Sequence, residues 1–265
     1  MRRASTCLAV LGVGAALALP SMASAAPEVT FKALAVPISG FPHTGNILGA
    51  GAAFQAQFTI KGTEYFGHPP PLIGVNVQLP KGTKLHTSGF ASCPVATLTE
   101  LKEPEKCPKK SKAGPVGHAR GFVQFGSEIV EEEVSIESFF APGGGLSFFV
   151  QGHSPTIIEI VSTGKYINLG GSGGFGPKFI GTVPLIKTVP GAAFGSTSTI
   201  NVKVGAAVKK GKETIYYGRV PKSCPKGGFP VKAEMIFAKE DALPEAVPGA
   251  IVTAESKAPC PPRKK

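Results

Sequence analysis

The stretch FQAQFTIK, residues 54–61, alternates apolar and polar side chains at every position. Its apolar members are Phe54, Ala56, Phe58 and Ile60, and each is followed by a polar or charged residue. Because successive side chains of a β-strand point to opposite faces, this period of two places all four apolar side chains on one face. The stretch therefore predicts a strand with one face in a core and the other toward solvent.

The same alternation, or a short run of β-branched residues, recurs along the chain between glycines and prolines. With 34 Gly and 25 Pro the sequence marks many turns, and only residues 95–101 are expected to form a helical turn. Further strands are expected at residues 72–79, 122–125, 129–140, 146–151, 156–162, 200–204, 214–220 and 231–237. The pattern predicts an all-β fold, either an antiparallel β-sandwich or a jelly-roll-like arrangement, with two packed β halves as a further option.

A glycine-rich piece near the middle, GGSGGFG at 170–176, suggests how the chain is divided. We expect an N-terminal β half at 27–169, a loop or linker at 170–176, a C-terminal β half at 177–250 and a basic tail at 251–265. A Leu-Pro-Lys triplet before Cys93-Pro94 has a Val-Pro-Lys counterpart before Cys224-Pro225, which favours related halves.

Residues 1–26 have the features of a secretory signal peptide. Arg2 and Arg3 precede the apolar run 8–19, and Ala23-Ser24-Ala25 is a small-residue cleavage site. Neither this run nor a later one has the roughly 20 apolar residues of a membrane-spanning helix. The sequence therefore predicts a secreted protein, extracellular or associated with the cell wall, without a transmembrane segment after cleavage.

Four cysteines remain after cleavage: Cys93, Cys107, Cys224 and Cys260. Four cysteines in an exported chain favour two disulfides with three possible connectivities, and proximity along the chain favours Cys93–Cys107 and Cys224–Cys260. Each is followed by proline, which pushes the cysteine toward an extended conformation. Zinc is the alternative, but no CxxC spacing occurs and the five histidines show no ligand spacing, so neither a metal nor another cofactor is expected.

Rare residue types exclude several classes of function. The 17 acidic residues include a single aspartate, Asp241, which argues against Asp-rich calcium loops and a Ser/His/Asp triad. Trp is absent and only four Tyr occur, so the aromatic platforms of sugar-binding surfaces are not indicated.

One acidic cluster and one histidine are the candidates for catalysis. A pair of carboxylates could serve glycoside hydrolysis, with His153 and the nearby Glu159 as further candidates. On a strand, however, the side chains of neighbouring residues diverge, and no GxSxG motif is present. We therefore expect a solvated acidic face and no catalytic residue; the cluster consists of Glu128, Glu131, Glu132, Glu133 and Glu137.

The chain is basic, with a formal net charge of +11 that falls to +9 without Arg2 and Arg3. Such a protein suits an anionic cell-wall polymer or another envelope protein, whereas nothing resembles a nucleic-acid-binding motif. The candidate anion-contact residues are Lys102, Lys109, Lys110 and Lys112, although three glutamates interrupt this stretch.

Three runs of the sequence carry a resemblance to a known group. FASCP with EKCPKKSKAGPVGHARG, FFAPGGGLSFFVQGHSP, and VPKSCPKGGFPVKAEMIF resemble exported actinobacterial β-rich proteins with paired Cys-Pro motifs. The resemblance implies secretion and β structure; the group has no known activity, so it implies no catalytic residue.

The sequence as a whole predicts a non-enzymatic secreted or envelope-associated β protein that acts by surface contact, in a structural, adhesive or wall-polymer-binding role. The alternative is a secreted hydrolase that uses glutamates of the 128–137 cluster with His153. A hydrolase should bring Glu128, Glu137 or Glu159 beside His153 in a pocket, whereas a polymer-binding module should gather its lysines on one face.

Overall fold

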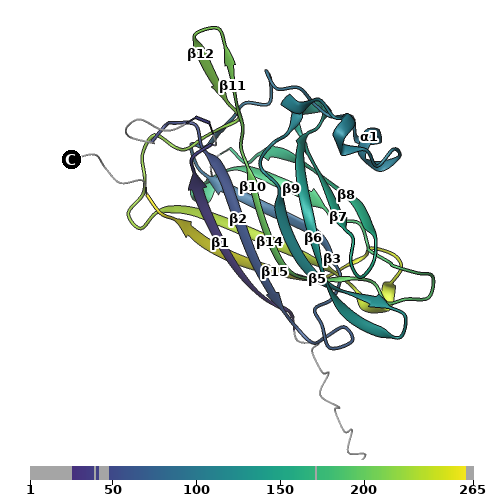
Figure 1. Cartoon of the computed structure of the whole chain (residues 1–265). Coiled ribbons are helices and arrows are strands. Elements are labelled where there is room, and N and C mark those ends of the chain that lie inside the picture. The colour runs from purple at the N-terminus through teal and green to yellow at the C-terminus, as the bar shows by residue number, and fades with distance from the viewer. Residues whose placement is uncertain (1–25, 39, 42–47, 171, 261–265) are drawn as a thin grey trace, which may run out of the picture.

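The computed structural model describes residues 26–38, 40–41, 48–170 and 172–260 (Figure 1). Apart from Ala26, the predicted signal peptide lies outside these residues, as does His43. The described chain is built of antiparallel strands with a few short helical turns, which confirms the predicted all-β class.

One large sheet contains eleven of the described strands. Its spatial order is β1-β2-β10-β5-β6-β7-β8-β9-β3-β14-β15, and each neighbouring pair is antiparallel. The strands are β1 (Glu28–Val36), β2 (Ala53–Lys61), β3 (Leu72–Pro80), β5 (Gly117–Phe125), β6 (Glu128–Phe140), β7 (Leu146–Gly152), β8 (Ile158–Asn168), β9 (Phe175–Thr182), β10 (Ser196–Val204), β14 (Phe229–Ala238) and β15 (Pro248–Ala258).

Several short strands and helical turns lie in the connections between the strands of this sheet. Two small ribbons pair β4 (Lys84–Leu85) with β13 (Gly218–Arg219), and β11 (Ala207–Lys210) with β12 (Glu213–Tyr216). The helical elements are α1 (Val95–Thr99), η1 (Pro104–Lys106), η2 (Lys109–Ser111), η3 (Pro142–Gly144), η4 (Ser172–Gly174) and η5 (Glu240–Ala242). The helical turn expected at 95–101 is thus present as α1.

The sheet curls until its two edge strands, β1 and β15, lie side by side and nearly close it into a barrel (Figure 1). With eleven strands that each oppose their neighbours, the first and last run in the same direction, so no antiparallel ladder can close the ring. Across this seam the backbone N–H of Ala33 donates to Ser256 Oγ at 3.0 Å.

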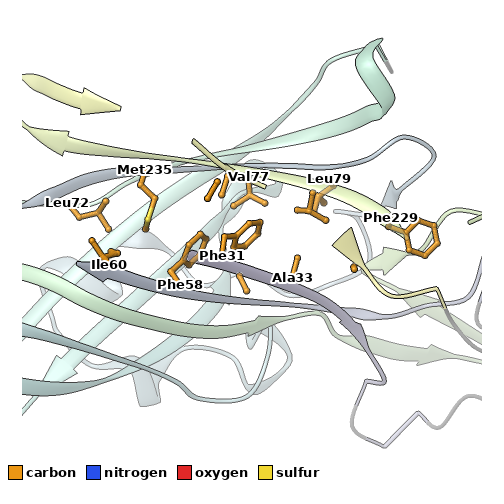
Figure 2. Close-up of a cluster of buried hydrophobic side chains, with 14 of the residues drawn as sticks. Phe31, Ala33, Phe58, Ile60, Leu72, Val77, Leu79, Phe229 and Met235 are labelled. Carbon is orange, nitrogen blue, oxygen red and sulfur yellow. The ribbon is translucent and has the colours of Figure 1, made fainter. Parts of the chain in front are cut away.

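The core lies between opposite walls of the curled sheet. Phe31 and Phe58 on one wall stack with ring centroids 4.7 Å apart, and they face Val77 and Met235 from the other wall (Figure 2). The two walls pack face to face there as sheets do in a sandwich, but they belong to one continuous sheet. Hydrophobic burial of these side chains stabilises the curled form.

Strands from both predicted halves share the sheet. β10 lies between β2 and β5, and β3 lies between β9 and β14. The segment 170–176 lies between β8 and β9, which pair with each other, so it includes the turn of a hairpin and the first residues of β9.

The described part of the predicted basic tail at 251–265 includes most of a strand that the alternation did not indicate. Residues up to Ala258 belong to β15, which pairs with β14. The strand was missed because its inward positions are occupied by small residues, Ala254 and Ala258, and a large one, Ile251, is 60% exposed. Propensity and hydrophobic alternation are weak where packing is made by alanine.

Both predicted cysteine pairs lie at disulfide distance. Cys93 and Cys107 have Cα atoms 5.1 Å apart and close the loop that contains α1, and Cys224 and Cys260 lie 5.9 Å apart. The first loop packs on the outer face of β6 and β7, where Leu98 is buried against Phe139 and Phe149. The sheet thus has a second, smaller core outside its interior.

Replacing Leu98 by Ala is expected to lower the free energy of unfolding by about 2–5 kcal/mol, because it empties a fully buried site under the disulfide loop. Leu101, 56% exposed and just beyond the same helical turn, is the matched control, and its replacement by Ala should cost less than about 0.5 kcal/mol. Urea unfolding of both variants measures the difference; equal losses would contradict the packing described.

An ion pair crosses three neighbouring strands, β9, β3 and β14, on the outer face of another part of the sheet. Glu234 on β14 lies 2.7 Å from Lys178 Nζ on β9, and its carboxylate also accepts from Asn76 on β3 at 3.3 Å. The hydrogen bond from Lys178 lowers the pKa of Glu234, so the folded state favours the charged carboxylate.

This lowered pKa predicts a pH-dependent contribution of Glu234. A carboxylate whose pKa is lower in the folded state stabilises the protein above its unfolded pKa of about 4.3, and the stabilisation is lost as the pH falls through the folded value. Glu234→Gln should therefore lower the melting temperature at pH 7 and much less at pH 2. The exposed Glu255→Gln should show a smaller difference between the two pH values.

Candidate functional site

The predicted catalytic residues do not form a common site. Glu137 pairs with Lys112, and Glu159 pairs with Lys102 at 3.2 Å and accepts from Gln151 at 3.3 Å. His153 is exposed in the β7–β8 loop, and no hydrogen bond or ion pair links it to another described residue. The carboxylates closest to it in sequence therefore serve as ion-pair partners of the disulfide loop and its exit.

Glu132 differs from its neighbours in the acidic cluster. Glu131 and Glu133 are exposed, and Glu133 pairs with Arg120 at 2.8 Å, whereas Glu132 is only 1% exposed. One of its carboxylate oxygens accepts from the backbone N–H of Thr156 at 3.3 Å, and the other has no partner among the described residues. The alternation of faces expected for this strand is present, but its inward face carries a buried carboxylate.

The four candidate anion-contact lysines fall into two kinds. Lys102 and Lys112 form ion pairs with glutamates, so part of their charge is neutralised. Lys109 and Lys110 lie on η2, are exposed, and form no ion pair within the described chain. Lys109 and Lys110 are therefore the two lysines of the predicted set whose charge has no ion-pair partner among the described residues.

The topology brings further lysines to the same end of the molecule. Because all neighbours in the sheet are antiparallel, the connections 81–116 and 205–228 both begin and finish at the end where β3 and β10 finish (Figure 1). The disulfide loop within 81–116 runs from there along the outer face of β6 and β7. We call this end, together with the disulfide loop, the basic end. Besides Lys109 and Lys110, its exposed basic residues without an ion pair among the described residues are Lys81, Lys84, Lys209, Lys210, Lys212, Lys222 and Lys226.

The loops at the opposite end of the sheet differ in their charged and apolar residues. Its loops, residues 62–71, 126–127, 153–157, 183–195 and 239–247, contain Lys187 and Lys239 but four acidic residues. Leu101 and Val116 of the 81–116 connection are exposed, but more of the exposed large apolar side chains lie at this opposite end: Phe66, Phe125, Ile129, Ile157, Val189 and Val247. Basic charge is therefore concentrated at one end rather than spread over the surface.

An apolar chamber lies inside the curled sheet. It has a volume of about 140 Å³ and is lined by side chains from both walls, among them Phe58, Val77, Phe148 and Val202. A smaller chamber of about 60 Å³ adjoins it toward the basic end. Both chambers are bordered by Phe54, Leu79, Tyr166 and Val204, so they form neighbouring parts of one interior space.

Two tyrosines supply the polar groups of the smaller chamber. Tyr217 is 2% exposed, and Tyr166 is its neighbour, with ring centroids 6.4 Å apart. Burial raises the pKa of Tyr166 to about 12 although the hydrogen bond with Tyr217 lowers it. Burial also raises the pKa of Tyr217, as does the neighbouring Tyr166, so both phenols stay protonated at neutral pH.

The backbone holds Tyr217 across the mouth of the sheet. Its N–H donates to the Ala206 carbonyl at 2.9 Å, and its own carbonyl accepts from the His86 N–H at 2.8 Å. The following residues, Gly218 and Arg219, form β13 and pair with β4, which borders the smaller chamber. This short ribbon borders the interior at the basic end.

Among the described residues, no group of three or more His, Cys, Asp or Glu side chains could hold a metal ion. Nor does the described part contain a helix long and apolar enough to cross a membrane. Searches of protein-family models, of curated proteins and of solved structures find no match to this chain.

Proposed function

We propose that this protein is a secreted or envelope-associated binding protein that attaches to an anionic cell-wall polymer through its basic end. The observation that carries the proposal is the gathering of nine exposed lysines, none with an ion pair among the described residues, on connections that are far apart in sequence. A repeating polyanion would contact several of these side chains at once, and many weak ionic contacts add up along a polymer.

The shape of the basic end suits an extended partner. Lys209, Lys210 and Lys212 lie on the β11–β12 hairpin, which projects beyond the large sheet (Figure 1). Several exposed cations on a projecting hairpin suit a flexible polymer with repeated anionic groups better than the other predicted partner, another envelope protein.

Export is part of the proposal. The signal-peptide features and two disulfide pairs both suit an oxidising compartment, where anionic envelope polymers occur. The hydrolase alternative has less support, since Glu137 and Glu159 are engaged with lysines and His153 has no carboxylate partner in the described residues.

Reversing two free lysines at the basic end is the test. Lys109→Glu combined with Lys110→Glu should weaken binding to poly-glutamate and to polyphosphate at least about fivefold at low salt. Wild-type affinity should fall steeply as salt is added, because exposed charges are screened beyond a Debye length of about 10 Å at 0.1 M. Calorimetry or a sedimentation assay with purified protein measures both effects.

The matched control reverses two exposed lysines at the opposite end, Lys187→Glu with Lys239→Glu. Both double variants have the same net charge, so a property of the overall charge would affect them equally. The proposal predicts a clear loss only for the Lys109/Lys110 variant. Equal losses, or wild-type binding that does not depend on salt, would refute it.

A further inference from the structure

Two basic residues lie directly opposite each other at the basic end. Arg219 on β13 pairs with Lys84 on β4 in an antiparallel register, and directly opposite residues of such a pair project on the same face. Neither side chain has an ion pair among the described residues. Like charges in directly opposite positions are destabilising. An anion between Arg219 and Lys84 would supply the missing counter-charge.

The surrounding chain supplies no counter-charge of its own. Arg219, Lys84 and their neighbours belong to the stretches 48–63, 81–99 and 214–233, and none of these contains Asp or Glu. The one acidic residue of the connection 205–228, Glu213, lies on the β11–β12 hairpin opposite Lys210. The counter-charge for Arg219 and Lys84 therefore has to come from a bound partner.

An aromatic ring holds the Arg219 guanidinium in place. The central carbon of the guanidinium lies 5.2 Å from the centre of the Tyr216 ring, which is a cation–π contact. Gly51 forms a β-bridge with Arg219, and a Cβ atom at Gly51 would overlap the Tyr216 ring. The absence of a side chain at Gly51 thus makes room for the ring beside the arginine. A guanidinium that is already oriented loses less conformational entropy when it binds an anion.

We propose that Arg219 and Lys84 bind a terminal phosphate group of the anionic polymer, an inference that rests on the proposed function and names the group that is recognised. A phosphate monoester carries about −1.5 to −2 charges at neutral pH, which balances two cations, and it has three acceptor oxygens. Two of these oxygens can accept from the planar guanidinium while the third accepts from the Lys84 ammonium group. A carboxylate has only two oxygens and a single charge, so it balances the pair in part.

Phenyl phosphate and phthalate are suitable probes, because they share a benzene ring and have similar charge, and phthalate divides its charge between two carboxylates. Wild-type protein should bind phenyl phosphate at least about threefold more tightly than phthalate. Arg219→Lys keeps the positive charge but removes the planar fork. It should weaken phenyl phosphate about three- to tenfold and reduce the preference over phthalate. Nuclear magnetic resonance titration of the purified full chain measures these affinities.

The matched control is Arg120→Lys. Arg120 is the other arginine of the described chain, and it pairs with Glu133 on β6. This substitution should leave the affinities for both probes unchanged. The Lys109→Glu and Lys110→Glu double variant, which tests the polymer contact, should also keep the preference for phenyl phosphate, because those lysines lie on η2 in the disulfide loop.

A charge reversal at Lys84 gives a second prediction. The new carboxylate should pair with Arg219, so Lys84→Glu should abolish binding of phenyl phosphate and raise the melting temperature of the unliganded protein by about 1–4 °C. Lys209→Glu makes the same change in net charge opposite Thr214, away from an arginine. It should retain phenyl phosphate binding and show no such rise in melting temperature.

Displacement of phenyl phosphate by a short polyphosphate links the site to the polymer, and wild type should show it. Equal affinity of wild type for phenyl phosphate and phthalate, or wild-type behaviour of Arg219→Lys, would overturn the phosphate site even if polyphosphate still binds in a salt-dependent manner. If phenyl phosphate binds through Arg219 but polyphosphate neither binds nor displaces it, the proposed polymer contact fails, and with it the assignment of the phosphate to a polymer.

Discussion

Eleven strands that each run opposite to their neighbours cannot close into a ring of antiparallel pairs, since the first and the last strand point the same way. In this protein β1 and β15 lie side by side at such a seam. A hydrogen bond from the backbone N–H of Ala33 to Ser256 Oγ links them in place of a backbone ladder. Small residues line the seam: Ala33 is 1% exposed and Ala258 4%. Around the curled sheet there are eleven contacts between adjacent strands. Backbone hydrogen bonds join ten of them, and close packing joins β1 to β15.

The strict antiparallel order also decides the chemistry of the two ends. Each connection between strands lies either at the end with the disulfide loop or at the end with the β5–β6 turn. The lysine-rich connections, 81–116 and 205–228, fall at the same end although more than 80 residues separate them. A strand added or removed between them would send them to opposite ends, so the basic end is a consequence of the topology.

The inner and the outer face of the sheet are packed in different ways. Inside, opposite walls meet around Phe31 and Phe58 but leave apolar space between β2, β3 and β8. Outside, the loop closed by Cys93 and Cys107 covers Phe139 and Phe149, which would otherwise expose aromatic surface to solvent. Among the described residues, the inward face of β6 also carries buried polar groups without a partner, the Ser138 hydroxyl and one oxygen of the Glu132 carboxylate.

The strands with clear alternation, such as 54–61 and 72–79, could be predicted from the sequence, as could the turn at Gly126-Ser127 and the two cysteine pairs, because each depends on local geometry or short chain separation. The pairing of β2 with β10 and of β3 with β9 could not, because register between distant strands is set by packing that no local pattern encodes. The candidate site, too, could be predicted from the sequence only in part. Lys109 and Lys110 were visible in the sequence as a basic run, whereas the lysines of 205–228 joined them only through the fold.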